Sequence, residues 1–335
     1  MSVIEIDGTK IGCGQAPYLI AELGINHNGS VEEAIKLIEA AASCGASAVK
    51  LQAFVPEEFL TRESQYFSAF SNLSFNDEQY QALFNAAAKQ GITIFASVFD
   101  TKSLAVMEKL SCPAYKVASG DITHLPLLQA FAATRKPIIM STGGATLDEC
   151  RDAINCILKE NREAQIGLLH CVSNYPLKFV DANLKVIEML KNEFQLPVGF
   201  SDHSIGFALP IAAVALGAQI IEKHFTLDVN AEGLDHALSA DVTVLKLIAE
   251  GVSAARLSLG SPEKKLVETS EQIVGIRRCI VARKKIIKGS IITSDMLLFK
   301  RPQIGILPGD FDKVLGMTAK VDLDVDQPLT WSDIE

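Results

Sequence analysis

Two histidines lie at the ends of consecutive apolar segments. His203 occurs in SDHS (201–204), and His224 occurs in EKHF (222–225). Neighbouring strands lie about 4.8 Å apart, so imidazoles at matching strand ends can share one metal ion. Each histidine alone is explained as simply by a loop cap or a carboxylate partner, but the pair favours a metal. Two histidines with open positions suit Mn²⁺, with Mg²⁺ or Co²⁺ as alternatives, better than four-ligand structural zinc.

Two lysines, Lys50 in AVKLQ and Lys116 in YKVASG, lie inside apolar segments. A buried, unpaired ammonium group costs several kcal/mol, so each lysine needs an anionic partner or a lowered pKa. One lysine could form a Schiff base with a carbonyl substrate. Alternatively, both could bind a phosphate or carboxylate, and hydroxyl groups at other segment ends favour this anion site. These hydroxyl groups belong to Ser119, Ser141, Ser173 and Ser201.

The elements that must position these residues are short apolar segments that end abruptly in polar residues. There are eight of them: 18–23, 47–52, 92–97, 114–119, 137–142, 166–171, 197–202 and 219–225. Segments with helical periodicity lie between them, for example 31–43. Eight alternations of strand and helix predict a (β/α)8 TIM barrel, with a doubly wound sheet as the competing α/β fold.

Side chains that can do chemistry end nearly every predicted strand. Because the active site of such a barrel is built from the carboxyl ends of its strands, we expect them to share one mouth. The further candidates are Glu22, Gln52, Ser97, Asp121, Glu222 and Asp235. Glu22 alone could equally be a surface residue, and Gly143-Gly144 could either admit a ligand close to the backbone or form a simple turn. Nucleotide binding has little support, since no Walker loop and no strand-linked GxGxxG is present.

The composition excludes several classes of protein. The 335 residues carry 31 basic and 40 acidic side chains, a net charge of -9, which disfavours nucleic acid and anionic membranes as partners. Seven cysteines without a CxxC motif indicate buried thiols in a reducing compartment, so we expect a cytoplasmic protein. The N-terminus does not read as a secretory signal. The uncharged stretch 204–221 is better explained by a buried helix and strand than by a membrane span.

The alternation of apolar segments and helical segments ends after Gly260. We expect a barrel domain over 1–260, a charged linker over 261–275 and a small, mostly β module over 276–335. The module carries 10 basic and 8 acidic side chains, net +2, which leaves net -11 for residues 1–275. Any positive potential at the barrel mouth must therefore be local.

Eight strings in order resemble the sialic acid synthase family, the bacterial N-acylneuraminate or nonulosonate synthases. They are IAELGINHNGS (20–30), GASAVKLQAF (45–54), YKVASGD (115–121), KPIIMSTGG (136–144), LLHCVSNYP (168–176), GFSDHSIG (199–206), ALGAQIIEKHFT (215–226) and LDHALSAD (234–241). The last segment resembles the antifreeze-like (SAF) domain of that family, through 277–293, 299–302 and 314–320. The resemblance covers nearly the whole chain.

The resemblance implies an enzyme that condenses phosphoenolpyruvate with an N-acyl-mannosamine-type sugar, giving a nine-carbon 2-keto acid and phosphate. It implies that His203 and His224 hold Mn²⁺ or a similar ion, and that Glu22 and Asp121 handle protons. Arg301 matches the position that reaches the N-acyl group in the other subunit of a domain-swapped homodimer. The implied phosphoenolpyruvate site comprises Lys50, Lys116, Ser119, Ser141, Ser173 and Ser201. Other implied substrate-binding residues are Gln52, Ser97, Tyr175, Glu222 and Asp235.

Three segments depart from the family pattern. ASVFD (96–100) replaces STPFD, STGGAT (141–146) replaces STGMAT, and residues 60–73 are idiosyncratic. The acceptor therefore stays open among N-acetylmannosamine, a 2,4-diacetamido hexose and other amino sugars, with a pseudaminic-type acceptor disfavoured by GINHNGS. The alternatives are a Schiff-base pyruvate aldolase and a non-catalytic sugar- or ice-binding scaffold.

Overall fold

The computed structural model describes residues 2–335 and divides the chain into two compact units. The first unit ends at Gly260, and the second spans Ser261–Glu335. Helix α11 (Ser270–Ile276) lies mostly within the range predicted as a linker. The two units are described separately below.

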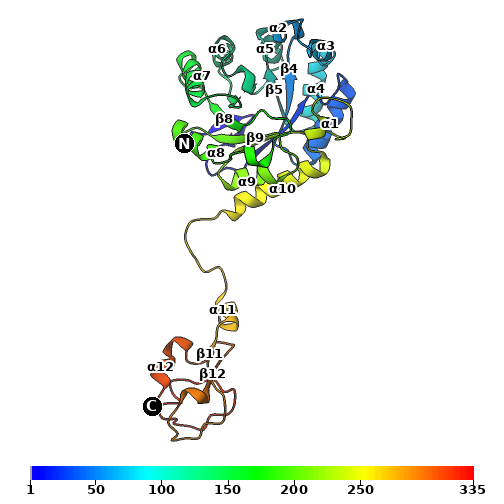
Figure 1. The fold of residues 1–335 in the computed structure, drawn as a ribbon. Helices are drawn as coiled ribbons and strands as arrows, with labels where there is room; N and C mark the ends of the chain where they lie inside the picture. Colours follow the sequence, from blue (N-terminus) through cyan, green and yellow to red (C-terminus); the bar gives the residue numbers. More distant parts are fainter. Residues whose placement is uncertain (1) are drawn as a thin grey trace. The chain divides into compact units, whose positions relative to one another are not determined.

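The first unit is a closed barrel of eight parallel strands, as predicted, and the closure excludes a doubly wound sheet (Figure 1). The strands are β3 (Tyr18–Gly24), β4 (Ala48–Ala53), β5 (Thr93–Val98), β6 (Tyr115–Val117), β7 (Ile138–Ser141), β8 (Ile166–Cys171), β9 (Val198–Asp202) and β10 (Ile220–His224). They follow one another in chain order, and β10 pairs with β3 to close the barrel. Nearly every strand residue is buried, which explains the continuous apolar segments of the sequence.

Helices surround the strands (Figure 1). They are α1 (Val31–Ser43), α4 (Asp77–Gln90), α5 (Thr101–Lys109), α6 (Leu125–Ala133), α7 (Leu147–Glu160), α8 (Val186–Phe194), α9 (Ala208–Ala215) and α10 (Val242–Ser258). Short helices α2 (Pro56–Phe59) and α3 (Phe67–Ser71) lie in the long connection after β4. Local sequence fixes several boundaries: Asn76 and Gln79 form a capping box that starts α4, and Gly91, at φ 67°, ends it.

The uncharged stretch 204–221 forms helix α9 and the start of β10, as predicted. No helix within residues 2–335 is long and apolar enough to cross a membrane. All seven cysteines are free thiols, and most are buried, but Cys13 is exposed because it lies in a surface loop rather than in a core segment.

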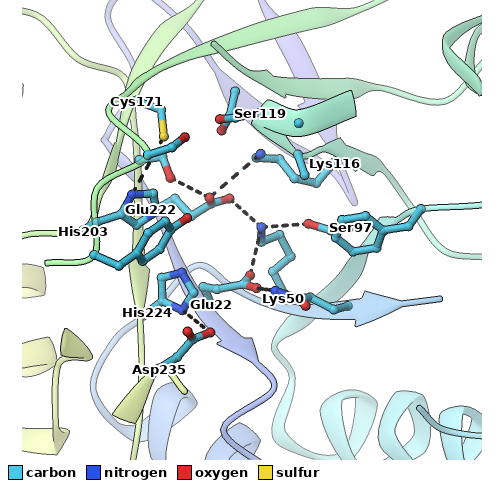
Figure 2. A pocket seen from close by; sticks show the side chains of 18 of the residues that line it. Glu22, Lys50, Ser97, Lys116, Ser119, Cys171, His203, Glu222, His224 and Asp235 are labelled. Carbon is cyan, nitrogen blue, oxygen red and sulfur yellow. Dashed lines mark hydrogen bonds and ion pairs between the residues drawn. The ribbon is translucent and has the colours of Figure 1, made fainter. Parts of the chain in front are cut away.

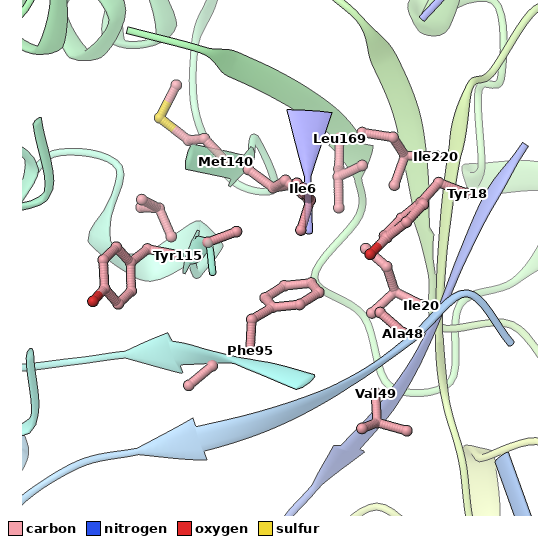
Figure 3. Close-up of a cluster of buried hydrophobic side chains, with 14 of the residues drawn as sticks. Ile6, Tyr18, Ile20, Ala48, Val49, Phe95, Tyr115, Met140, Leu169 and Ile220 are labelled. Carbon is pink, nitrogen blue, oxygen red and sulfur yellow. The ribbon is translucent and has the colours of Figure 1, made fainter. Parts of the chain in front are cut away.

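An N-terminal hairpin that the sequence analysis did not predict precedes the barrel. Strands β1 (Ile4–Ile6) and β2 (Thr9–Ile11) pair through a two-residue Asp7-Gly8 turn, in which both residues have positive φ. Ile6 is fully buried among the side chains that fill the barrel (Figure 3). Thr93, the first residue of β5, donates a hydrogen bond to Asp7. The hairpin therefore covers the amino-terminal end of the strands and leaves the carboxyl end open.

The second unit has its own small apolar core, which includes Ile280, Leu297 and Leu323. Strands β11 (Cys279–Ala282) and β12 (Leu297–Lys300) pair antiparallel, and α12 (Phe311–Val314) follows. Isolated bridges such as Ile286 with Leu323 supply further β pairing. The predicted small β module is confirmed, although much of its pairing is by single bridges.

Candidate active site

A cavity of about 310 Å³ opens at the carboxyl ends of the barrel strands. Fourteen of the sixteen site residues proposed from the sequence line it, and Figure 2 shows most of the charged ones. They are Glu22, Lys50, Gln52, Ser97, Lys116, Ser119, Ser141, Ser173, Tyr175, Ser201, His203, Glu222, His224 and Asp235. The parallel barrel explains this convergence, because most of these residues lie on a strand or just after its carboxyl end, whereas Asp235 lies in the longer segment after β10.

A buried charge network joins strands β3, β4 and β10. Lys50 Nζ lies 2.9 Å from Glu22 Oε2 and 3.1 Å from Glu222 Oε2, and it donates a hydrogen bond of 2.9 Å to Ser97 (Figure 2). Burial opposes the charge of Lys50, but the two carboxylates outweigh it and raise the lysine pKa. Lys50 therefore stays protonated, and its charge is already offset within the network.

The two glutamates of this network differ in pKa. Burial raises the pKa of Glu22 to about 7, against the attraction of Lys50. Burial also acts on Glu222, but Lys116 and Lys50 outweigh it and lower the pKa to about 2. Glu222 is thus a fixed anion, whereas Glu22 can gain or lose a proton near neutral pH.

Lys116 is buried on β6 and is less well paired than Lys50. Its Nζ lies 4.0 Å from Glu222 and donates a hydrogen bond of 2.8 Å to its neighbour, the carbonyl group of Val117. Burial lowers its pKa to about 8, because desolvation and the repulsion from Lys50 outweigh Glu222. Lys116 is therefore the cation of this cavity with most charge left for an anionic ligand.

Hydroxyl groups and a glycine backbone surround the space near Lys116. Gly143 N donates a hydrogen bond of 3.1 Å to Ser119 Oγ. A Cβ atom on Gly143 would lie 2.4 Å from Ser173 Oγ, so only glycine admits the backbone this close. Ser141 Oγ is buried and has no hydrogen-bond partner within residues 2–335. An oxyanion would satisfy these donors.

The two histidines face the same cavity, with ring centroids 5.5 Å apart. His203 Nδ1 lies 3.0 Å from the Val172 carbonyl oxygen, and His224 Nδ1 lies 3.5 Å from Asp235 Oδ2. The Val172 contact occupies His203 Nδ1 and leaves its Nε2 available to a ligand, as in metal-binding histidines. His224 Nδ1 is buried without a hydrogen-bond partner within residues 2–335, although Asp235 lies close to it. Burial, together with His203 and Lys50, keeps the pKa of His224 well below its usual value, so this imidazole is neutral.

The residues therefore fit a divalent metal with an open coordination sphere. No group of three or more His, Cys, Asp or Glu side chains within residues 2–335 is arranged to hold a metal by itself. Two imidazoles would leave the remaining positions to water or substrate oxygens, in keeping with Mn²⁺ rather than structural zinc. Tyr175 stacks on His203, with ring centroids 4.1 Å apart, and covers one side of the pair.

Two proposed site residues do not line the cavity. Asp121 lies at the end of a short 3-10 helix (Ser119–Asp121), where burial raises its pKa to about 6. Arg301 is exposed in the second unit, next to Pro302. Asp202 and Lys223, also at strand ends, pair with each other at 2.7 Å and are fully buried outside the cavity lining.

Sequence reasoning missed six lining residues, because it considered mainly charged and hydroxyl groups; two of them, Ala118 and Gly120, have no polar side chain. Cys171 ends β8, and its Sγ lies 4.0 Å from His203 Nδ1. Phe99 directly follows β5, whereas Phe59 and Phe70 come from the connection after β4. Phe99 could have been found from its place after a strand, but nothing in the residue pattern placed the other two rings.

Comparison with known families and structures gives consistent results. The NeuB family model matches residues 37–264, and the SAF domain model matches residues 277–335. The N,N'-diacetyllegionaminic acid synthase of Campylobacter jejuni is 37% identical, over 90% of this chain and 95% of the relative. The pseudaminic acid synthase of Helicobacter pylori is 35% identical, over 96% of this chain and 98% of the relative.

Among solved structures, the N-acetylneuraminic acid synthetase of Leptospira borgpetersenii is similar with a TM-score of 0.77 and 34% identity. The match covers 81% of this chain and 94% of the other chain. The relatives thus make three different sugar acids at comparable identity, so overall similarity does not single out one acceptor.

Proposed function

The chain belongs to the NeuB family and carries a SAF domain, and from this premise we propose that it condenses phosphoenolpyruvate with an N-acyl-mannosamine-type amino sugar. The products are a nine-carbon 2-keto acid, that is, a sialic acid or a related nonulosonate, and phosphate. The observation that carries this proposal is that an oxyanion site and two imidazoles share one cavity. The reaction requires both, because its donor is a phosphorylated carboxylate and its acceptor is an aldehyde.

Phosphoenolpyruvate is proposed to bind with its anionic groups near Lys116, Ser119, Ser141 and Ser173. Lys116 supplies the charge, the serines and Gly143 supply close polar contacts, and Ser141 gains a partner for its buried hydroxyl group. The carbon–carbon bond forms when C3 of the donor attacks the aldehyde carbon. Water then adds to C2, and the C2–O bond breaks as phosphate leaves.

His203 and His224 are proposed to hold a divalent ion, Mn²⁺ in the first place. Such an ion, when bound, supplies Lewis-acid polarisation of the aldehyde oxygen. The chain's part is to fix the His203 ring through Val172 and to hold the Asp235 carboxyl group close to His224. Since Lys50 is already neutralised by Glu22 and Glu222, a metal cation would also offset the negative charge of the donor.

Glu22 is proposed as the group that moves protons. Its pKa of about 7 lets it accept a proton from the attacking water or deliver one to the oxygen of the acceptor. Gln52 Nε2 donates a hydrogen bond of 3.3 Å to Glu22 Oε1, and Lys50 contacts the other oxygen, so the carboxyl group is held in place. Gln52 and Asp235, which also line the cavity, are proposed to contact the sugar hydroxyl groups.

We also propose a cytoplasmic, domain-swapped homodimer in which Arg301 of one subunit binds the N-acyl group at the partner's cavity. The proposal is supported by the SAF domain and by the exposure of Arg301.

The direct test is incubation of the full chain with phosphoenolpyruvate, Mn²⁺ and a panel of acceptors, with phosphate release as the readout. The panel contains N-acetylmannosamine and 2,4-diacetamido hexoses. Release that depends on an acceptor, with a 2-keto acid of the expected mass, supports the proposal. No release with any acceptor would overturn it.

A second candidate, a Schiff-base aldolase, is favoured by one observation, the lowered pKa of the buried Lys116. Such a lysine is nucleophilic near neutral pH. This candidate requires that borohydride traps pyruvate on Lys116 and that chelators leave activity unchanged. The synthase requires the opposite result in both experiments.

A further inference from the structure

A buried ion pair joins the two strands at whose ends the imidazoles lie. Asp202 of β9 and Lys223 of β10 are paired residues in the β9–β10 ladder, and Asp202 Oδ2 lies 2.7 Å from Lys223 Nζ. Both side chains are fully buried, and neither lines the cavity. His203 directly follows Asp202 in the chain, and His224 directly follows Lys223. The ion pair therefore lies next to both histidines, on the face of the strands that points away from the cavity.

The same ion pair binds both backbone groups of Ser204, the residue after His203. Asp202 Oδ1 accepts a hydrogen bond of 2.9 Å from Ser204 N. Lys223 Nζ donates a hydrogen bond to the carbonyl oxygen of Ser204. Residues 202–204 are thus closed into a small loop by two side chains, and His203 is the central residue of this loop.

The two histidines differ in how their backbone is held. His224 is the last residue of β10, and the barrel itself holds it, because it is paired with Glu22 in the β10–β3 ladder. His203 lies one residue beyond the end of β9, and its carbonyl oxygen accepts a hydrogen bond of 2.9 Å from Leu177 N, in the segment after β8. The ion pair adds a link between the loop that carries His203 and strand β10.

Stability alone does not explain a charged pair at this place. Two buried charges lose their hydration, and apolar side chains of similar volume often stabilise a fold equally well or better. Apolar side chains could not bind the N–H and carbonyl groups of Ser204, however. The ion pair with these two hydrogen bonds favours one arrangement of the loop. Two rings that share a metal ion require such a fixed arrangement, because the ion sets the separation of its ligands.

Resting on the proposed function, we propose that Asp202 and Lys223 are positioning residues of the metal site. Their ion pair fixes His203 relative to His224, so that the two imidazoles, with ring centroids 5.5 Å apart, can bind one divalent ion (Figure 2). Neither residue touches the ion or a substrate, since both lie outside the cavity lining. They act through the backbone of residues 202–204.

The test measures Mn²⁺ binding to the full chain by electron paramagnetic resonance, without substrates. Asp202→Val/Lys223→Met removes both charges together, so no unpaired charge stays buried and the variant should fold. We expect its dissociation constant for Mn²⁺ to rise by about tenfold or more, as for loss of a residue that orients a metal ligand. Asp202→Asn keeps an oxygen acceptor for Ser204 N but loses the charge that attracts Lys223, so the rise should be smaller.

Two further measurements separate positioning from a general loss of stability. Urea unfolding shows that each variant is folded and how much stability it has lost. Lys136→Met is the control, because it removes an ion pair of 2.6 Å with Glu108 just before β7, at the opposite end of the barrel. Its Mn²⁺ binding should equal that of the wild type. In assays of phosphate release, the Mn²⁺ concentration for half-maximal activity should rise in the double variant, with little change in KM for phosphoenolpyruvate.

Each outcome decides between the inference and the proposed function. Wild-type affinity for Mn²⁺ in the folded double variant would overturn the inference and leave the proposed function intact. If the double variant does not fold, wild-type affinity in Asp202→Asn overturns the inference. If the variants bind Mn²⁺ weakly but the wild type releases no phosphate with any acceptor, the proposed function fails and the inference stands. If the wild-type chain does not bind Mn²⁺, both fail.

Discussion

Glu22 and Lys50 are paired residues across the β3–β4 ladder, and their side chains form a buried ion pair of 2.9 Å inside the cavity. The same ammonium group lies 3.1 Å from Glu222, so one cation serves two carboxylates. The carboxyl groups share the cation unequally, because Lys116 also attracts Glu222. Glu222 therefore stays ionised, and Glu22 is the carboxyl group that titrates near neutral pH.

Burial raises the pKa of both Glu22 and Asp121, but Glu22 lines the cavity and Asp121 does not, so Glu22 is the better candidate for proton transfer. We expect Glu22→Gln to lower kcat by about a hundredfold or more, the usual effect of losing a general acid or base. Asp121→Asn should change kcat little, because Asp121 does not line the cavity. Steady-state phosphate release measures the activity of both variants. An equal loss of kcat in Asp121→Asn would contradict the assignment of proton transfer to Glu22.

Lys50 is predicted to stabilise the folded barrel in addition to organising the site. Lys50→Met leaves Glu22 and Glu222 buried without their shared cation, and we expect the free energy of unfolding to fall by about 3 kcal/mol at pH 7. A buried carboxyl group with a raised pKa is more stable protonated, so the loss should shrink as the pH falls from 7 to 5.

Urea unfolding followed by far-UV circular dichroism measures this effect, since the single tryptophan, Trp331, lies in the second unit. Lys36→Met is the control, because Lys36 is exposed and pairs with Glu33 on the surface of α1. A destabilisation of Lys50→Met no larger than that of the control would show that the network contributes nothing to stability.

The pKa of Lys116 predicts a pH dependence for donor binding. Since burial lowers this pKa to about 8, the ammonium group is lost as the pH rises through that value, and kcat/KM for phosphoenolpyruvate should fall there. Lys116→Arg keeps its charge at these pH values, so its lower activity should not fall in the same range. If Lys116→Arg shows the same decline, another group is titrating.

The sequence was sufficient to predict the barrel, because all eight strands are buried on both faces and leave unbroken apolar segments. The hairpin β1–β2 was missed, since strands of three residues are too short to show periodicity. The signal was nevertheless present: Asp7-Gly8 between the triplets IEI (4–6) and TKI (9–11) is a typical two-residue hairpin turn.

Most of the site was predictable from the barrel itself, because residues at the carboxyl ends of parallel strands converge on one mouth. Successive side chains of a strand point to opposite faces. Because Ser201, His203, Glu222 and His224 line the cavity, this alternation also predicts that Asp202 and Lys223 point away from it. Phe59 and Phe70 could not be placed, because they lie in a long connection whose path no periodic pattern determines.

The imidazole pair predicts a specific pattern of metal binding. We expect chelation to abolish activity and Mn²⁺ to restore it, and His203→Ala to abolish the Mn²⁺ binding detected by electron paramagnetic resonance. Asp235→Asn should weaken this binding by about 10- to 100-fold, as expected for a residue that orients a ligand. His124→Ala is the control, since His124 is exposed outside the cavity. Unchanged Mn²⁺ binding in His203→Ala would contradict the assignment.

Arg301 is predicted to act on the acceptor and to do so across subunits. Loss of a charged hydrogen bond to the N-acyl oxygen should raise KM for the sugar by about 10- to 100-fold in Arg301→Ala, with little change for phosphoenolpyruvate. Arg283→Ala, an exposed arginine of the same unit, is the control. Equal effects on both substrates would show that Arg301 does not contact the acceptor.

A mixing experiment separates action within one subunit from action across two. Glu22→Gln and Arg301→Ala chains are each defective at limiting acceptor, but a mixed dimer would hold one site with an intact Glu22 and an intact Arg301 from the partner chain. After denaturation and refolding together in equal amounts, about a quarter of wild-type activity should return, since half the dimers are mixed and half their sites are intact. If the mixture is only as active as the average of the two variants, or if sedimentation shows a monomer, Arg301 does not act across subunits.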